Sequence, residues 1–256
     1  MVTAAAGSDL AGIAGTVARR RRRGGQRADA QPGLVPTGLA SKKKTLHATE
    51  RDTARLCLAR RRYRRRICHY AVKRLKFIDE SGLNIAMTRR YGRALRGQRV
   101  HDAVPKNLGR NLSILGALTW YGMDAVMTVE GAVDTEVFRA YVRHVLAPTL
   151  RKGDVVVMDN LSVHKAPDIE RTIKQAGARL IYLPSYSPDW SPIEPCWSKL
   201  KTWLRSAKAR TREALDLALT EAIGRITNGD ARAWFAHCGY ALHSFENRSK
   251  NLLSIF

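Results

Sequence analysis

The sequence has few cysteines and no long apolar stretch. Its four cysteines are scattered along the chain, and no two form a C-x-x-C pair, which argues against a zinc knuckle and against a disulfide framework. No apolar run is long enough to span a membrane. The mildly apolar residues 10–18 precede the first arginine run instead of following it, unlike a secretory signal. We therefore expect a reduced, cytoplasmic protein.

Acidic residues are scarce relative to basic ones. The chain holds 22 Asp and Glu against 45 Lys and Arg, which gives a formal net charge of +23. Such a charge is typical of proteins that bind a polyanion, above all nucleic acid. Residues 1–76 contain 20 basic and 4 acidic side chains and so carry most of the excess. This part is either a solvated basic arm or an arm that contacts DNA phosphates with little base specificity.

Sequence patterns divide the chain into three parts. Residues 1–74 form a basic, poorly ordered and largely irregular N-terminal segment, although residues 50–70 could form a very basic helix. Residues 75–245 alternate strand-like and helix-like segments, and the hydrophobic content of 45% is enough for one sizeable core. Residues 246–256 form a C-terminal tail.

The order of elements in the central part predicts an α/β domain with a mixed five-stranded sheet flanked by helices. Strands are expected at residues 75–79, 111–120, 124–130, 154–159 and 179–183, with a further candidate strand at residues 85–91. Helices are expected at residues 135–150, 167–176, about 192–204 and 211–227. This order matches a ribonuclease-H-like arrangement.

Two aspartates stand at the ends of predicted strands. Asp79 follows Phe-Ile, and Asp159 follows the apolar run Val-Val-Val-Met. An ionised carboxylate at the end of a buried strand costs free energy unless a partner compensates its desolvation. Each aspartate could cap the turn that follows it or could bind a cation. Glu80 points to the other face of the strand, so Asp79 is the better ligand candidate.

Glu194 is the third candidate acid. It ends the sequence Ser-Pro-Ile-Glu, which fits a capping box with proline at the first helical position, and the first turn of a helix also presents an acid well. His164 follows Asp159 by five residues. A neutral imidazole there could orient water or contact a phosphate, as could Lys165, or it could be a local hydrogen-bonding residue. No second histidine stands at ligand spacing, so a zinc site is not indicated.

Three carboxylates of this kind suit metal-dependent cleavage of a phosphodiester. Two divalent cations about 3.5–4 Å apart activate the attacking oxygen and stabilise the leaving oxygen. Hard cations such as Mg²⁺ bind a few carboxylates and leave room for water and phosphate. The sequence therefore predicts metal ligands at Asp79, Asp159 and Glu194, with His164 as a further catalytic candidate.

Several sequence blocks resemble the DDE transposases of the mariner-like superfamily, in the branch found in bacterial insertion sequences. The likeness runs from about residue 41 to residue 246, and 34 residues lie between Asp159 and Glu194, which is the spacing of this branch. The blocks are residues 77–82 (FIDESG), residues 157–160 (VMDN) with His164 and Lys165, residues 183–188 (LPSYSP), residues 192–194 (PIE) and Trp197.

The resemblance implies a ribonuclease-H-like fold and two Mg²⁺ or Mn²⁺ ions held by Asp79, Asp159 and Glu194. It implies excision and insertion of a DNA element through hydrolysis followed by attack of a 3′-hydroxyl. The implied partners are double-stranded DNA, as element ends and target site, and a second copy of the chain in a homodimer on that DNA. A bacterial protein of this kind would associate with the nucleoid. Tyr186 and Trp197 are expected to support their loop and helix by packing.

The N-terminal part departs from the family pattern. Members normally begin with a helix-turn-helix region, which residues 1–40 do not resemble, and residues 54–74 are unusually rich in arginine. Trp190 and Ser191 stand where Leu and Asn are more common. Two alternatives stay open. One is another nuclease of the same fold, such as a ribonuclease or resolvase, against which the 34-residue spacing argues. The other is a truncated, inactive transposase remnant that only binds DNA.

Overall fold

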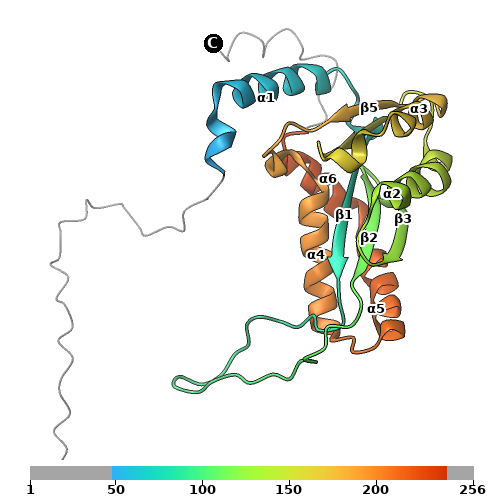
Figure 1. Ribbon diagram of the computed structural model, residues 1–256. Coiled ribbons are helices and arrows are strands. Elements are labelled where there is room, and N and C mark those ends of the chain that lie inside the picture. The colour runs from blue at the N-terminus through green and yellow to red at the C-terminus, as the bar shows by residue number, and fades with distance from the viewer. Residues whose placement is uncertain (1–47, 241–256) are drawn as a thin grey trace, which may run out of the picture. The chain divides into compact units, whose positions relative to one another are not determined.

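Five strands form one mixed sheet at the centre of the computed structural model, which describes residues 48–240 (Figure 1). The order across the sheet is β3-β2-β1-β4-β5. β1 pairs antiparallel with β2 and parallel with β4, β3 pairs antiparallel with β2, and β5 pairs parallel with β4. The mixed five-stranded sheet predicted from the sequence is thus confirmed. The strands are β1 (Leu75–Leu83), β2 (Leu112–Thr119), β3 (Gly122–Glu130), β4 (Val155–Met158) and β5 (Arg179–Tyr182).

β1 is longer than the sequence pattern predicts. It runs along β2 from Lys76 to Leu83, whereas its pairing with the short strand β4 ends at Phe77. Asp79 therefore lies just beyond the β1–β4 ladder but in the middle of the β1–β2 ladder. The predicted hairpin of β2 and β3 is present, and its turn residue Gly122 has a φ of +125°, which glycine adopts readily.

The candidate strand at residues 85–91 is not formed. Residues 84–111 connect β1 to β2 without a helix or a strand. Ile85 and Met87 pack against buried hydrophobic residues without joining the sheet, and Tyr91 is 90% exposed. Arg210 fixes the start of this connection by donating hydrogen bonds to the carbonyls of Ile85 at 2.9 Å and Met87 at 3.0 Å.

Helices pack on both faces of the sheet and create two hydrophobic cores (Figure 1). Because successive side chains of a strand point to opposite faces, Phe77 belongs to one core and Ile78 to the other. The Phe77 core contains residues of α4, α5 and α6, and the Ile78 core contains residues of α2 and α3. The helices are α2 (Thr135–Tyr141), α3 (Pro167–Gln175), α4 (Ile193–Ala207), α5 (Arg212–Gly224) and α6 (Asn228–His237).

Two helical regions differ from the prediction. Residues 135–150 are not one α-helix, because α2 is followed by a π-helical turn at Val142–Leu146 and a 3-10 turn at Ala147–Thr149. Pro148 lacks an N–H and does not support a regular helix there. α5 is capped by Thr211, whose hydroxyl accepts a hydrogen bond from the backbone of Ala214. α6 was not predicted from the sequence.

The basic helix expected within residues 50–70 is present as α1 (Ala54–Ile67). It buries Tyr63 and Ile67 in the Phe77 core and leaves most of its arginines exposed. The basic run at residues 19–23 and the tail at residues 246–256 lie outside the described residues, and a domain boundary at residue 74 stays a prediction. No helix within the described range is long and apolar enough to cross a membrane.

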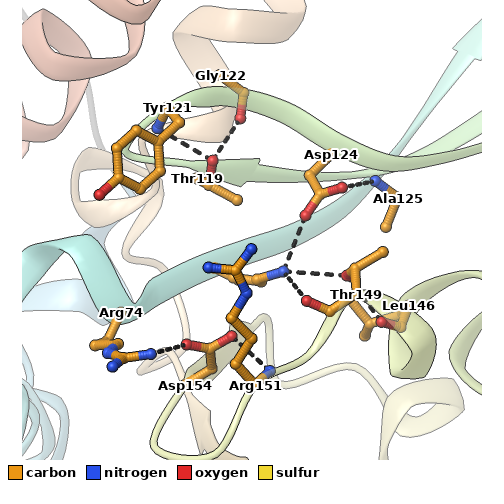
Figure 2. A network of polar contacts seen from close by, with 11 residues as sticks. Arg74, Thr119, Tyr121, Gly122, Asp124, Ala125, Leu146, Thr149, Arg151 and Asp154 are labelled. Carbon is orange, nitrogen blue, oxygen red and sulfur yellow. Dashed lines mark hydrogen bonds and ion pairs between the residues drawn. The ribbon is translucent and has the colours of Figure 1, made fainter.

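A polar network surrounds the start of β1 (Figure 2). Lys76 is only 8% exposed, and its ammonium group donates to Asp124 Oδ2 at 2.9 Å, to the Thr149 carbonyl at 2.8 Å and to the Thr149 hydroxyl at 3.1 Å. Asp154, which is also buried, faces the Arg74 guanidinium at 3.4 Å. Each buried charge of this network therefore has a partner of opposite sign.

Candidate metal centre

Asp79 lies on the face of β1 that packs against α4. Its Oδ2 accepts a hydrogen bond from the indole nitrogen of Trp197 at 3.0 Å. Partial burial raises the pKa of the Asp79 carboxyl, and the negative charges of Glu194 and Glu80 raise it further, to about 7. No Lys or Arg of the described chain lies within ion-pair distance of Asp79. The carboxylate is thus placed where a cation would relieve a real electrostatic cost.

Glu194 stands in the first turn of α4 and is exposed. The predicted capping box is not formed, because Pro192 is the N-cap residue and no side chain caps the helix. The backbone N–H of Glu194 donates a hydrogen bond to the Ser191 carbonyl at 3.1 Å, so this contact does not use the Glu194 side chain. The Glu194 carboxylate therefore remains available for another role. Glu194 lines the same cleft as Asp79, and the volume of this cleft is about 390 Å³.

Two cationic residues of this cleft escaped the sequence analysis. Lys201 and Arg205 line it together with Asp79 and Glu194. They follow Glu194 by two and three helical turns, so helical spacing from the acid would have placed them on the same side of α4. Partial burial and the charge of Arg205 lower the pKa of Lys201. The cleft thus has acids at one end of α4 and cations further along it.

Asp159 directly follows β4, as predicted. The parallel register pairs Phe77 with Val157, so Asp79 and Asp159 each stand two residues further along neighbouring strands. Oδ1 of Asp159 accepts from the backbone N–H of Leu161 at 3.2 Å and lies 2.5 Å from His164 Nδ1. Oδ2 has no hydrogen-bond partner among the residues that the structure describes. Asp159 Oδ1 therefore stabilises the turn, while Oδ2 has no hydrogen-bond partner among the described residues.

His164 is buried between two carboxylates. It is 1% exposed, with Nδ1 facing Asp159 and Nε2 lying 3.3 Å from Glu80 Oε2. Burial alone would lower the pKa of His164, but the two carboxylates outweigh it and raise the pKa to about 9. The ring is thus an imidazolium at neutral pH, not the neutral imidazole expected from the sequence. Its two ring nitrogens face the carboxylates of Asp159 and Glu80. The sequence argument that Glu80 points away from the Asp79 face agrees with this contact.

The structure brings two of the three predicted metal ligands together. Asp79 and Glu194 line one cleft, whereas Asp159 is turned toward His164. Within residues 48–240, no three His, Cys, Asp or Glu side chains gather closely enough to hold a metal ion together. The chemistry of the donors still fits, because carboxylate oxygens are the ligands that Mg²⁺ and Mn²⁺ prefer.

The loop before α4 is held by α1. Trp190 stacks on Tyr63 at a centroid distance of 5.6 Å, and the Arg60 guanidinium lies 3.7 Å above the Trp190 ring. Arg60 also donates two hydrogen bonds to Asp189, at 2.7 and 3.1 Å. The tryptophan that departs from the family pattern therefore joins α1 to this loop. Tyr186 was expected to pack in the loop, but it is 51% exposed.

The sheet order and the helices on both faces define a ribonuclease-H-like domain. A family model described as "DDE superfamily endonuclease" matches residues 74–216, which is more than half of the chain. The chain therefore belongs to this family of endonucleases.

Known transposases are similar to this chain. The Tcb2 transposase of Caenorhabditis briggsae is 24% identical over 108 residues, which cover 41% of this chain and 40% of that protein. The Mos1 transposase paired-end complex with left transposon end is 15% identical with a TM-score of 0.62, and the match covers 79% of this chain and 64% of that one. The Mos1 mariner paired end complex with Mn is 16% identical with a TM-score of 0.61, over the same shares of the two chains.

These similarities confirm the ribonuclease-H-like fold. The chain spans about two fifths of the Tcb2 protein and less than two thirds of the two Mos1 chains.

Proposed function

We propose that this protein is a metal-dependent DNA transposase, which hydrolyses a phosphodiester at the end of a DNA element and joins the freed 3′-hydroxyl to a target. The observation that carries the proposal is the shared cleft of Asp79 and Glu194. Burial and the charge of Glu194 raise the pKa of Asp79, and neither acid has a cationic partner at ion-pair distance in the described chain, so the two carboxylates are suited to bind a cation. The Mos1 paired end complexes with Mn and with Mg support the choice of divalent ions.

Asp79, Asp159 and Glu194 are the residues that would hold two Mg²⁺ or Mn²⁺ ions. When bound, such ions activate the attacking oxygen and neutralise charge on the phosphate. Asp79 is presented by the central strand and Glu194 by the first turn of α4. Asp159 contributes Oδ2, because its Oδ1 is already engaged by the Leu161 backbone and by His164.

His164 acts through Asp159 in this proposal. Its imidazolium fixes one oxygen of the carboxylate and is itself held by Glu80. Groups that orient metal ligands in this way tune both the geometry and the affinity of a site. His164 is therefore a positioning residue, and it would influence catalysis through Asp159 instead of contacting the substrate.

The cations of the cleft and of α1 would contact the DNA backbone. Lys201 and Arg205 continue the cleft away from the acids, where a phosphate next to the cleaved bond needs a positive counterpart. The exposed arginines of α1 add charge beside the loop that leads to Glu194. We expect DNA affinity to fall steeply with salt concentration, because phosphate contacts release counterions.

The test is cleavage of DNA in the presence and absence of metal. Supercoiled plasmid and a labelled duplex carrying the element's own flanking ends are incubated with Mg²⁺ or Mn²⁺, or with EDTA. We expect metal-dependent nicking that falls on the order of 1,000-fold or more in Asp159→Ala and Glu194→Ala. Glu170→Gln, a surface acid of α3 paired with Lys174, is the control and should cleave normally. Full activity of Asp159→Ala would refute the assignment.

An inactive remnant that only binds DNA is the second candidate. It is favoured by the geometry at Asp159, which is turned toward His164 instead of joining the other two acids. In that case the protein would bind DNA in a salt-dependent way and would cleave under no metal condition. Cleavage without dependence on the terminal repeat would indicate a nuclease without end recognition.

The finer features of the resemblance belong to the same proposal. They are membership in the bacterial insertion-sequence branch, a homodimer on paired element ends, and association with the nucleoid. Analytical ultracentrifugation with and without duplex ends tests the dimer, since a chain that stays monomeric on DNA would exclude it.

A further inference from the structure

The indole of Trp197 is the one neutral hydrogen-bond donor that contacts a predicted metal ligand from a neighbouring helix in the described chain. Trp197 follows Glu194 by three residues on α4, so both side chains emerge on neighbouring positions of one side of that helix. The ring is 3% exposed, and its Nε1 donates to Asp79 Oδ2 at 3.0 Å. A buried indole N–H needs an acceptor, and here the acceptor is a carboxylate of the candidate centre.

Gly116 makes the room for this contact. It is the residue of β2 directly opposite Asp79 in the β1–β2 ladder. A Cβ atom at this position would stand 3.2 Å from Trp197 Cη2 and 2.6 Å from Met123 Cε. The methionine end can move, but the tryptophan ring is rigid and buried. The glycine is required here by space and not by a positive φ, which it does not have.

We propose that Trp197 is a positioning residue, which holds the Asp79 carboxylate through its indole N–H in a slot that Gly116 leaves open. This inference rests on the proposed function, in which Asp79 is a metal ligand. Because Glu194 and Trp197 belong to the same first turns of α4, the contact also ties the Asp79 carboxylate to the part of the helix that presents Glu194. The helix thus supplies one ligand and orients another, whereas simple packing of the ring would require no particular acceptor.

The hydrogen bond itself is tested without any activity measurement. The protein contains five tryptophans, so a spectrum of ¹⁵N-indole-labelled protein shows one N–H signal for each. Trp197→Phe identifies the signal of Trp197 by its loss. We expect Asp79→Asn to shift this signal more than the other four, and we expect Mg²⁺ to shift it in the wild type but not in Asp79→Asn. A Trp197 signal that ignores Asp79→Asn would overturn the contact.

The positioning role is tested by Mn²⁺ binding, followed by electron paramagnetic resonance of the free ion. Trp197→Phe keeps an aromatic ring and removes the N–H, and we expect its Mn²⁺ affinity to fall about tenfold. Trp203→Phe is the matched control, because Trp203 is also on α4 and its buried N–H has no hydrogen-bond partner in the described chain. It should bind Mn²⁺ as the wild type does. Gly116→Ala should weaken Mn²⁺ binding like Trp197→Phe, because it displaces the ring.

The outcomes separate this inference from the proposed function. Cleavage by Trp197→Phe should recover at high Mn²⁺ concentration, because the ligands are intact and only their arrangement is weakened. Wild-type Mn²⁺ affinity in a folded Trp197→Phe protein would refute the positioning role while leaving the proposed function standing. Wild-type Mn²⁺ binding and cleavage in Asp79→Asn would refute the proposed function, and the indole spectrum would still decide whether Trp197 bonds to Asp79.

Discussion

Lys76 and Asp79 stand three residues apart on β1, and the charges around the two side chains differ. Lys76 is buried with an ionised partner in Asp124 and two oxygens of Thr149 as further acceptors (Figure 2). Asp79 receives a hydrogen bond from the neutral indole of Trp197, and the charged groups that raise its pKa are acids. The two side chains also lie on opposite faces of the sheet, since their positions differ by an odd number.

The difference separates a structural charge from a functional one. A buried charge is tolerated when nearby groups compensate its lost hydration, as they do around Lys76. Around Asp79 the fold gathers like charge instead, which costs stability and is useful only if a cation arrives. Clusters of this kind are characteristic of active sites. The comparison therefore predicts that neutralising Lys76 lowers the free energy of unfolding and that neutralising Asp79 raises it.

Neutralising the compensated charge should have the largest effect on stability. Lys76→Met keeps the length of the side chain but leaves Asp124 and the Thr149 carbonyl without their donor. We expect the free energy of unfolding to fall by about 3 kcal/mol, since the three oxygens that share this buried ammonium group lose a charged donor at once. Urea denaturation measures the change. Lys73→Met, an exposed lysine just before β1, is the control and should unfold like the wild type.

Neutralising the uncompensated charge should stabilise the metal-free protein. The pKa of the Asp79 carboxyl is about 7 in the folded protein, against an ordinary value of 3.8. The protonated carboxyl therefore contributes its full stabilisation below pH 3.8, and this contribution is lost as the pH rises to about 7. Above that pH, Asp79→Asn should be more stable than the wild type, on the order of 2 kcal/mol in the free energy of unfolding.

Magnesium sharpens this second prediction. Added Mg²⁺ should stabilise the wild type at a pH above about 7 and leave Asp79→Asn unchanged, because the proton and the metal compete for the same carboxylate. Denaturation at several pH values, with Mg²⁺ or EDTA, provides the measurement. A variant that is less stable than the wild type at all pH values would show that Asp79 is compensated after all.

His164 provides an intermediate case, because it is a buried cation that serves a predicted ligand. Its imidazolium is held by Asp159 on one side and Glu80 on the other. We expect His164→Gln to lower Mn²⁺ affinity about tenfold, the usual scale for a group that orients a metal ligand. Asp159→Asn, which removes a ligand, should lower it further. Equal Mn²⁺ affinity in His164→Gln and wild type would reduce His164 to a packing residue.

The sequence predicted what local patterns encode. Alternation and apolar runs placed all five strands, and residue spacing selected the two aspartates and Glu194 as candidate ligands. The extension of β1 past Asp79 was not foreseen, because it depends on pairing with β2 and not on the residues of β1 alone. The apolar residues at 85–91 suggested a strand, but a strand also needs a neighbour to pair with.

Contacts between distant segments could not be predicted in the same way. The Trp197–Asp79 hydrogen bond joins residues 118 positions apart, and the Arg60–Asp189 contact joins residues 129 apart. The raised pKa of His164 depends on Asp159 and also on Glu80, which lies on β1 and was set aside because it points away from Asp79. Lys201 and Arg205 are different, since helical spacing from Glu194 would have revealed them.

Arg60 offers the smallest and most discriminating test, because its ion pair with Asp189 is about as buried as that of Lys76 with Asp124 but can be altered without removing the charge. The side chains of Arg60 and Asp189 are 11% and 37% exposed, against 10% and 37% for Lys76 and Asp124. Arg60→Lys keeps the charge but loses the fork of hydrogen bonds to Asp189 and the stacking on Trp190. We expect a loss of about 1 kcal/mol in the free energy of unfolding, less than for Lys76→Met, because a positive charge still faces Asp189.

The control for Arg60 is its exposed neighbour on α1, since Arg61→Lys should leave stability unchanged. Mn²⁺ affinity adds a second measurement, because Arg60 holds the loop that leads into α4 and thus to Glu194. A loss of stability with unchanged Mn²⁺ binding would mean that α1 only fastens the loop. A loss in both would extend the chain of positioning contacts from the basic helix to the metal ligands. A loss as large as that of Lys76→Met would contradict the view that a retained charge still compensates Asp189.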